Sequence, residues 1–223
     1  MINQIQPWIN SQEANYLKKI INKKYLTENQ ETKKFEKNLK NKFKVNHAIA
    51  VSNWTNGIFL LLKSANIKKG DEVIVPNLTF IATVTPVIWA GATPVLCDVD
   101  KDNFCLDLDK LSKLINSKTK CVIPVHLYGH CCDLQKLSKI TKKKKILIIE
   151  DAAQAMGAKY KNRYLGTISN MGGFSFYGNK IMTTGEGGVI FVKNKKISKK
   201  IYALKNHGRE KKGIFKHKII GYN

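Results

Sequence analysis

Apolar residues recur with two different periods along the 223-residue chain. Residues 11–43 show helical spacing in two segments that break near Lys24–Thr27, and the second segment carries Phe35, Leu39 and Phe43 on one face. From residue 44 onward, short apolar runs rich in valine and isoleucine alternate with helical stretches. This alternation is typical of a mostly parallel sheet covered by helices on both faces, so we predict an α/β fold.

The predicted elements follow this alternating order. Strands are expected at 48–51, 72–75, 94–99, 121–125 and 146–149, and helices at 55–65, 80–90, 108–116 and 133–141. Gly157–Gly166 then predicts a hairpin with Asn162 in its turn. Strands at 173–177 and 188–192 flank a glycine-rich bend, and a basic helix is expected over 195–206. We predict one domain, with N-terminal helices over 1–43 and an α/β core over 44–223.

Composition excludes several classes of protein. With 43% hydrophobic and 25% charged residues, the chain resembles ordinary globular proteins and not disordered ones. Its apolar runs fall far short of the ~20 residues of a membrane-spanning helix, and its polar N-terminus does not resemble a signal peptide. Five cysteines form no CxxC pair, so we expect reduced thiols in a cytoplasmic protein and no metal site.

The charge balance is strongly basic, because 39 Lys+Arg residues oppose 16 Asp+Glu residues and give a net charge of +23. The lysines are scattered, and arginine occurs only at Arg163 and Arg209. This distribution favours a solvated surface and no specific nucleic-acid site. A polyanion-binding face remains the alternative interpretation.

Polar residues follow several of the predicted strands, at the sheet edge where parallel α/β proteins bind ligands. The segment Ser52–Gly57 leads from a strand into a helix, whose first N–H groups would hold an anion such as phosphate. An ordinary helix cap by Ser52, Asn53 or Thr55 explains the same residues.

Asp151 and Lys180 also follow apolar strands. A buried carboxylate at Asp151 would need a cation or a proton as its partner, although a helix N-cap is the alternative. A desolvated Lys180 would have a lowered pKa and could attack a carbonyl, although a solvated lysine is the alternative. A lysine for the aldehyde, an acid for the ring nitrogen and a phosphate cradle are what pyridoxal phosphate requires.

Taken in order, these segments resemble the DegT-type nucleotide-sugar aminotransferases, a group of fold-type I pyridoxal-phosphate enzymes. The resemblance runs from about Gln6 to Asn223 and includes the motifs GDEVIVP (70–76), TFIAT (79–83), AGATP (90–94), PVHLYG (124–129), EDAAQA (150–155), FSFY (174–177), TTGEGG (183–188), NHGR (206–209) and GYN (221–223). It implies the three-layer large domain of that fold type, with a mixed, mostly parallel sheet covered by helices.

The resemblance also implies roles for residues at the matching positions. Lys180 corresponds to the lysine that forms the Schiff base, Asp151 to the acid paired with the pyridine nitrogen, and Gln154 to the residue beside the phenolic oxygen. Phe80 corresponds to the aromatic residue that lies against the cofactor ring, and Thr55, Ser175 and the backbone of Trp54 correspond to phosphate contacts. Asn223 corresponds to the residue that contacts the phosphate of the neighbouring subunit in a homodimer. Glu186 corresponds to a position near the substrate.

The implied reaction transfers an amino group from an amino acid, usually glutamate, to a keto sugar attached to a nucleotide, in amino-sugar biosynthesis for surface polysaccharide. Some relatives deoxygenate sugars with a histidine at the lysine position, and Lys180 argues against that reaction. A regulatory, non-catalytic relative is a second rival interpretation, and the joint presence of Lys180, Asp151 and Gln154 argues against it. A non-catalytic polyanion-binding protein, suggested by the net charge alone, is the third.

Two features depart from the family pattern. Trp54 stands where many members have glycine. Tryptophan is acceptable if φ is negative there, because only the N–H is needed, whereas a positive φ would disrupt the phosphate cradle. Family members also continue past Gly221–Asn223 into a smaller C-terminal domain, so we expect this chain to lack that domain and to be a fragment.

Overall fold

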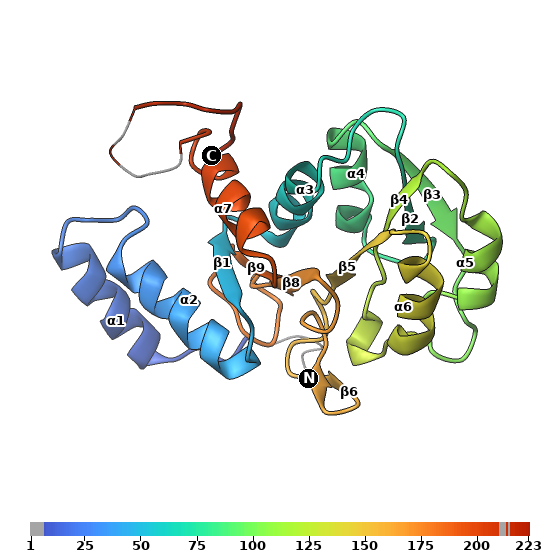
Figure 1. Cartoon of the computed structure of the whole chain (residues 1–223). Helices are drawn as coiled ribbons and strands as arrows, with labels where there is room; N and C mark the ends of the chain where they lie inside the picture. Colours follow the sequence, from blue (N-terminus) through green and yellow to red (C-terminus); the bar gives the residue numbers. More distant parts are fainter. Residues whose placement is uncertain (1–6, 210–212, 214) are drawn as a thin grey trace.

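The computed structural model describes residues 7–209, 213 and 215–223. Within them, a seven-stranded sheet has the order β1-β9-β8-β5-β4-β2-β3 (Figure 1). Its strands are β1 (His47–Val51), β2 (Glu72–Pro76), β3 (Thr93–Cys97), β4 (Thr119–Val122), β5 (Leu147–Asp151), β8 (Met171–Ser175) and β9 (Gly188–Val192). β9 is antiparallel to both of its neighbours, and all other pairs are parallel. The prediction of a mixed, mostly parallel sheet is confirmed.

Helices cover both faces of this sheet. One face packs against α3 (Trp54–Ser64), α4 (Thr85–Trp89) and α7 (Lys195–Leu204), and the other against α2 (Gln30–Phe43), α5 (Leu108–Leu114) and α6 (Leu134–Lys142). Successive strand residues point to opposite faces, so Val73 and Val75 join the α3 side while Ile74 joins the other side. The result is the predicted three-layer arrangement, with an apolar core on each side of the sheet.

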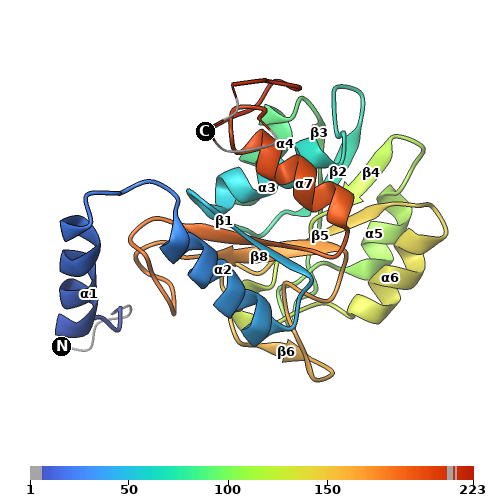
Figure 2. The ribbon, with the colours of Figure 1, turned by 60° about the vertical axis from the view of Figure 1, so that its left-hand side comes forward.

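The two N-terminal helices break where the sequence predicts. α1 (Ser11–Asn22) begins with a capping box between Asn10 and Glu13, buries none of its residues and lies at the edge of the molecule (Figure 2). α2 buries Leu39 and Phe43, the core residues of its predicted apolar stripe. Residues 1–6, 210–212 and 214 of the predicted segments lie outside the described residues. The predicted domain boundaries stay predictions.

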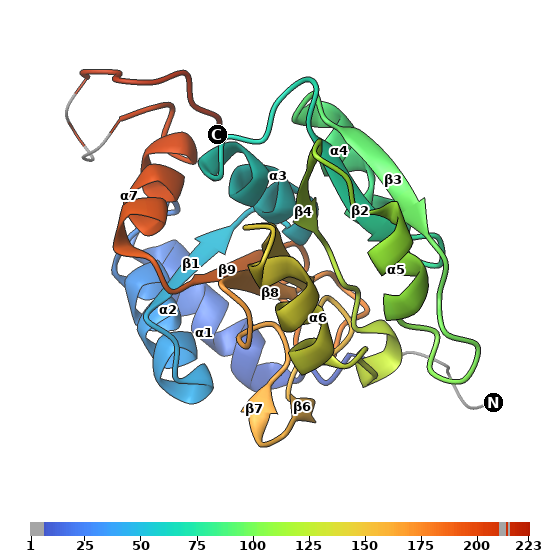
Figure 3. The ribbon, with the colours of Figure 1, turned by 45° about the vertical axis from the view of Figure 1, so that its right-hand side comes forward.

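The predicted hairpin is formed by β6 (Lys159–Tyr160) and β7 (Arg163–Tyr164), at the lower edge of the molecule in Figure 3. Lys161 and Asn162 both have positive φ, 47° and 65°. That pair of left-handed residues is what a two-residue hairpin turn demands, and asparagine adopts the conformation readily.

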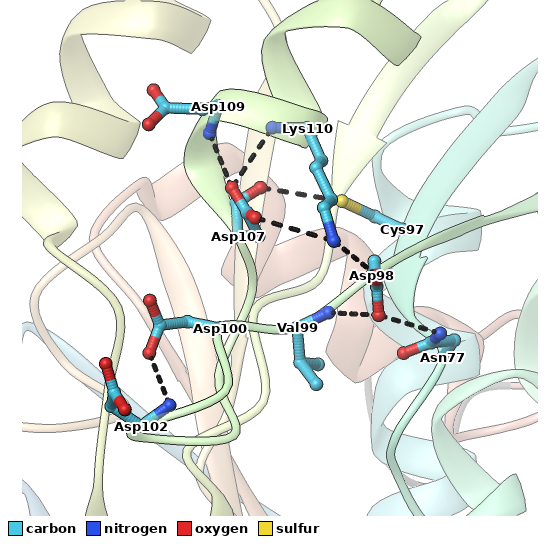
Figure 4. Close-up of polar contacts among 9 residues, drawn as sticks. All are labelled: Asn77, Cys97, Asp98, Val99, Asp100, Asp102, Asp107, Asp109 and Lys110. Atoms are coloured by element: carbon cyan, nitrogen blue, oxygen red, sulfur yellow. Dashed lines mark hydrogen bonds and ion pairs between the residues drawn. The ribbon is translucent and has the colours of Figure 1, made fainter.

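Two predicted elements differ from the structure for local reasons. The predicted strand 94–99 ends at Cys97, because Asp98 accepts hydrogen bonds from the Val99 N–H and from Asn77 Nδ2 (Figure 4). The predicted helix 80–90 divides into a short 3₁₀ turn (Ile81–Thr83) and α4. Pro86 explains the division, since it lacks the N–H that a continuous helix would need.

Three other strands end two or three residues away from their predicted ends at the sheet's carboxyl edge. β4 ends at Val122 rather than Val125, because Pro124 has no N–H for the strand ladder. β5 extends to Asp151 rather than ending at Ile149, and β8 ends at Ser175 rather than Tyr177. In the part of the chain that is described, no helix combines the length and apolar character needed to cross a bilayer.

Candidate active site

Asp151 is the last residue of β5, at the centre of the sheet, and is only 4% exposed. Its Oδ1 accepts hydrogen bonds from Trp54 Nε1 at 2.8 Å and from the Ala153 N–H at 3.1 Å. Its Oδ2 accepts one from Thr83 Oγ1 at 2.7 Å. These three donors compensate for the burial of the carboxylate. The chain after Asp151 enters turns that lead to β6, so the interpretation of Asp151 as a helix N-cap is wrong.

Thr83 lies in the 3₁₀ turn after β2 and is buried. Its hydroxyl has one proton, which it donates to Asp151. Thr79 Oγ1, 2.8 Å from Thr83 Oγ1, must therefore be the donor in their mutual hydrogen bond. Both threonines belong to the TFIAT motif, but sequence reasoning gave them no role. Two hydroxyls four residues apart, directly after a strand, were the available signal.

Trp54 is the first residue of α3 and is only 3% exposed. It is not among the non-glycine residues with positive φ, so this position does not require glycine and the expected obstacle to a phosphate cradle is absent. Asn53 caps α3 by accepting from the Asn56 N–H at 2.8 Å, which confirms the cap interpretation.

The Asn53 cap leaves some N–H groups at the start of α3 available to bind a ligand. Within the described chain, the N–H groups of Trp54 and Thr55 donate to no protein acceptor. Free N–H groups and the helix dipole together favour an anion at this end of the 11-residue α3. The cap and an anion site are therefore compatible.

Ser175 is brought to the same place by the strand register. It ends β8 and pairs with Gly188, the first residue of β9. A Cβ atom on Gly188 would lie 2.8 Å from the backbone nitrogen of Trp54, so the start of β9 touches the start of α3. The half-buried side chains of Thr55 and Ser175 thus belong to adjacent segments.

Lys180 lies in the turn after β8, where its N–H donates to the Tyr177 carbonyl at 2.9 Å. Its side chain is half-buried, which argues against the plain solvated lysine. Burial lowers the pKa of Lys180, and the negative charge of Asp151 opposes this shift by raising the pKa. The amine and the carboxylate therefore interact electrostatically at the carboxyl edge of the sheet.

The other predicted residues are distributed around this edge. Gln154 Oε1 accepts from the N–H of Tyr128, at 3.3 Å, and the Phe80 ring is 72% exposed. Asn223 and Glu186 line an open cavity of about 1100 Å³ beside the start of α3. Among the described residues, no hydrogen bond or ion pair joins Phe80 or Asn223 to Asp151 or Lys180.

A second buried pair lies directly behind Asp151, and sequence reasoning did not predict it. Glu150 is the preceding residue of β5, and its Oε2 lies 2.9 Å from His126 Nε2 and accepts from the Gly166 N–H at 2.8 Å. Its Oε1 accepts from the Ser169 N–H. Burial acts to raise the pKa of Glu150, but the hydrogen bond and charge of His126 and the two N–H donors produce a net lowering.

The donor set at this edge fits pyridoxal phosphate. The Asp151 carboxylate retains acceptor capacity on Oδ2 for a protonated ring nitrogen, and Lys180 supplies an amine with a lowered pKa. The free N–H groups of Trp54 and Thr55, with the Ser175 hydroxyl, are suited to a phosphate group.

Comparison with known proteins points in the same direction. The chain is 36% identical over 219 residues to GDP-perosamine synthase of Escherichia coli O157:H7, covering 98% of this chain and 60% of that protein. It is 42% identical over 189 residues to GDP-perosamine synthase of Caulobacter vibrioides, covering 85% of this chain and 51% of that protein. The chain thus spans between half and two thirds of the length of these relatives.

Solved structures agree in fold. The aminotransferase from Psychrobacter cryohalolentis superposes with a TM-score of 0.91 at 34% identity, over 98% of this chain and 59% of that one. A sugar aminotransferase of Streptococcus pneumoniae in its PLP form gives 0.92 at 30% identity, over 99% of this chain and 62% of that one. The profile of the DegT/DnrJ/EryC1/StrS aminotransferase family matches residues 7–223, and this chain belongs to that family.

Proposed function

We propose that this protein uses pyridoxal 5'-phosphate to transfer an amino group from glutamate to the keto carbon of a nucleotide-linked sugar. The product would serve amino-sugar biosynthesis for surface polysaccharide, and the enzyme would act as a cytoplasmic homodimer. The names of its relatives support this substrate class. Besides the GDP-perosamine synthases, they include a UDP-N-acetyl-3-dehydro-alpha-D-glucosamine 3-aminotransferase of Acidithiobacillus ferrooxidans, 36% identical over 180 residues.

One observation carries the proposal: a half-buried lysine and a buried, hydrogen-bonded carboxylate interact at the carboxyl edge of the sheet. Lys180 and Asp151 are the amine and the acid that this cofactor's chemistry needs. Trp54 and Thr55 supply an anion site at the start of α3, beside the end of β8.

Bound at this edge, pyridoxal phosphate would supply an aldehyde that combines with amines and a ring that accepts electrons from the adjacent carbon. Asp151 would hold the proton on the ring nitrogen, because its negative charge stabilises the protonated ring. The N–H groups of Trp54 and Thr55 and the Ser175 hydroxyl would bind the phosphate and fix the position of the ring.

Lys180 would hold the cofactor through Nζ and then act as general acid and base. Its lowered pKa leaves more of the neutral amine near neutral pH than an ordinary lysine provides. In the first half of the reaction that amine would move a proton from the donor's α-carbon to the aldehyde carbon of the cofactor. In the second half it would move a proton from that carbon to the keto carbon of the sugar. Since both halves use the same lysine, its loss should abolish turnover. The presence of lysine at this position also favours amino transfer over sugar deoxygenation.

The direct test incubates the full-length protein that contains this chain with the cofactor, glutamate and a panel of GDP- and UDP-linked keto sugars. Mass spectrometry then detects replacement of the carbonyl oxygen by an amino group. We expect product with the wild type, none with Lys180→Ala, and product with Lys193→Ala. Lys193 is a matched control, because desolvation also lowers its pKa, but it follows the end of β9 that pairs with the start of β8, at the sheet edge opposite to Lys180. Amination that survives in Lys180→Ala, or none with any sugar, would overturn the proposal.

A further inference from the structure

The side chain of Trp54 makes a contact that phosphate binding does not require. A phosphate contact at this position needs only the backbone N–H, yet the buried indole reaches β5 and donates from Nε1 to Asp151 Oδ1 at 2.8 Å. A hydrogen bond between a buried N–H and a carboxylate is among the stronger polar contacts in proteins.

Two glycines provide the space that the indole occupies. A Cβ atom on Gly57 would lie 2.8 Å from Trp54 Cε3. A Cβ on Gly173 would lie 2.4 Å from Trp54 Cζ3 and 1.9 Å from the carbonyl oxygen of Val189. Neither glycine has a positive φ, so the indole is the main reason for Gly57, whereas both the indole and the Val189 backbone leave no room for a side chain at Gly173. Gly57 lies inside α3, where glycine costs about 1 kcal/mol relative to alanine. The indole is thus held between its own helix and β8, with its N–H directed at Asp151.

The indole also makes the two oxygens of Asp151 unequal. Oδ1 accepts from both Trp54 Nε1 and the Ala153 N–H, while Oδ2 accepts from Thr83 alone. A carboxylate oxygen accepts about two hydrogen bonds, so Oδ1 is saturated and Oδ2 keeps one lone pair. Rotation of the carboxylate would break all three contacts.

We propose that Trp54 is a positioning residue, whose indole N–H orients Asp151 so that Oδ2 is presented to the ring nitrogen of the cofactor. The proposal rests on the proposed function for the identity of the ring. The alternative is that the indole only fills space in the core. The two accounts differ for Trp54→Phe, which keeps an aromatic ring between the glycines but removes the N–H.

The first test uses the protein without cofactor and follows indole N–H exchange with solvent by NMR. Trp8 and Trp89 are exposed, so their indole signals are internal references. We expect the Trp54 signal to exchange at least about tenfold more slowly than both, as one hydrogen bond to a charged group implies. Asp151→Ala should abolish most of this protection, whereas Thr83→Val, which removes the donor to the other oxygen, should preserve it. Fast exchange in the wild type, or equal protection in Asp151→Ala, would overturn the proposal.

The second test uses the cofactor-loaded protein and separates orientation from binding. Trp54→Phe should bind pyridoxal phosphate within about twofold of the wild type, because the backbone N–H remains, but should react with glutamate at least about tenfold more slowly. Trp89→Phe is the matched control and should change neither quantity. An unchanged rate in Trp54→Phe would show that the indole only fills space. A wild-type protein that binds no cofactor would instead reject the proposed function, and the exchange test would still decide whether the indole orients Asp151.

Discussion

His126 Nε2 lies 2.9 Å from Glu150 Oε2, and neither side chain is exposed to solvent. The same histidine donates its backbone N–H to the carbonyl oxygen of Asp151, also at 2.9 Å. Both oxygens of Glu150 accept hydrogen bonds from backbone N–H groups, as an ionised carboxylate does, and His126 Nε2 is therefore the donor to Oε2. The pair thus joins the segment that follows β4 to the end of β5, where Asp151 lies.

Glu150→Gln should destabilise the protein by about 2 kcal/mol, since it removes the charge from a buried set of hydrogen bonds. Urea denaturation at neutral pH measures the change. Glu36→Gln is a suitable control. The Glu36 carboxylate also accepts hydrogen bonds, from the Ala50 N–H and the Tyr202 hydroxyl, but burial raises its pKa, so the folded protein does not favour its charged form. If the two variants lose the same free energy of unfolding, the His126–Glu150 pair does not stabilise the protein more than Glu36 does.

The Glu150 pair should also contribute to acid sensitivity. Its folded-state pKa lies below the ordinary value of 4.5, so its contribution to stability is complete above about pH 4.5 and is lost as pH falls through the folded-state pKa. Denaturation midpoints measured from pH 7 downward should therefore fall more steeply in the wild type than in Glu150→Gln. Parallel curves would show that Glu150 does not titrate with unfolding.

Lys180 should react with aldehydes at lower pH than an ordinary lysine, whose pKa is about 10.5, because burial lowers its pKa. The charge of Asp151 opposes that shift, so Asp151→Asn should lower the pKa of Lys180 further. Labelling of the cofactor-free protein at a series of pH values, with peptide mass spectrometry, gives the profile of each lysine. A profile that moves to higher pH in Asp151→Asn would contradict the interaction.

Asp151→Asn should still bind pyridoxal phosphate but lose at least about a hundredfold in amino transfer, because the neutral amide does not hold the proton on the ring nitrogen. Absorbance titration measures binding, and glutamate-dependent amination measures turnover. Near-normal turnover would mean that the essential acid is a different residue.

Asn53→Ala should destabilise the protein by about 1 kcal/mol through loss of the α3 cap, and it should also weaken cofactor binding by disordering the anion site. Asn194→Ala removes the corresponding cap of α7 and should cost similar stability with no loss of cofactor affinity. The pair separates helix stability from phosphate binding. Equal effects of the two variants on affinity would argue against a phosphate site at α3.

The sequence predicted the order of elements well because apolar periodicity is a local property, as the stripe at Leu39 and Phe43 shows. It did not predict the contacts that orient Asp151. Trp54 and Thr83 are 97 and 68 residues away from Asp151 in the chain, and they meet it only when α3 and the turn after β2 pack against β5. Family resemblance suggested the backbone of Trp54, but the role of its indole depends on tertiary packing.

The most direct test of the account is borohydride reduction of the protein in the presence of pyridoxal phosphate, followed by peptide mass spectrometry. Reduction joins the cofactor permanently to the amine that holds it. We predict one dominant labelled site at Lys180, no labelling there after Lys180→Ala, and little label at Lys193. Label distributed over the many surface lysines, or a dominant site that persists after Lys180→Ala, would contradict the assignment of Lys180 and the proposed function that depends on it.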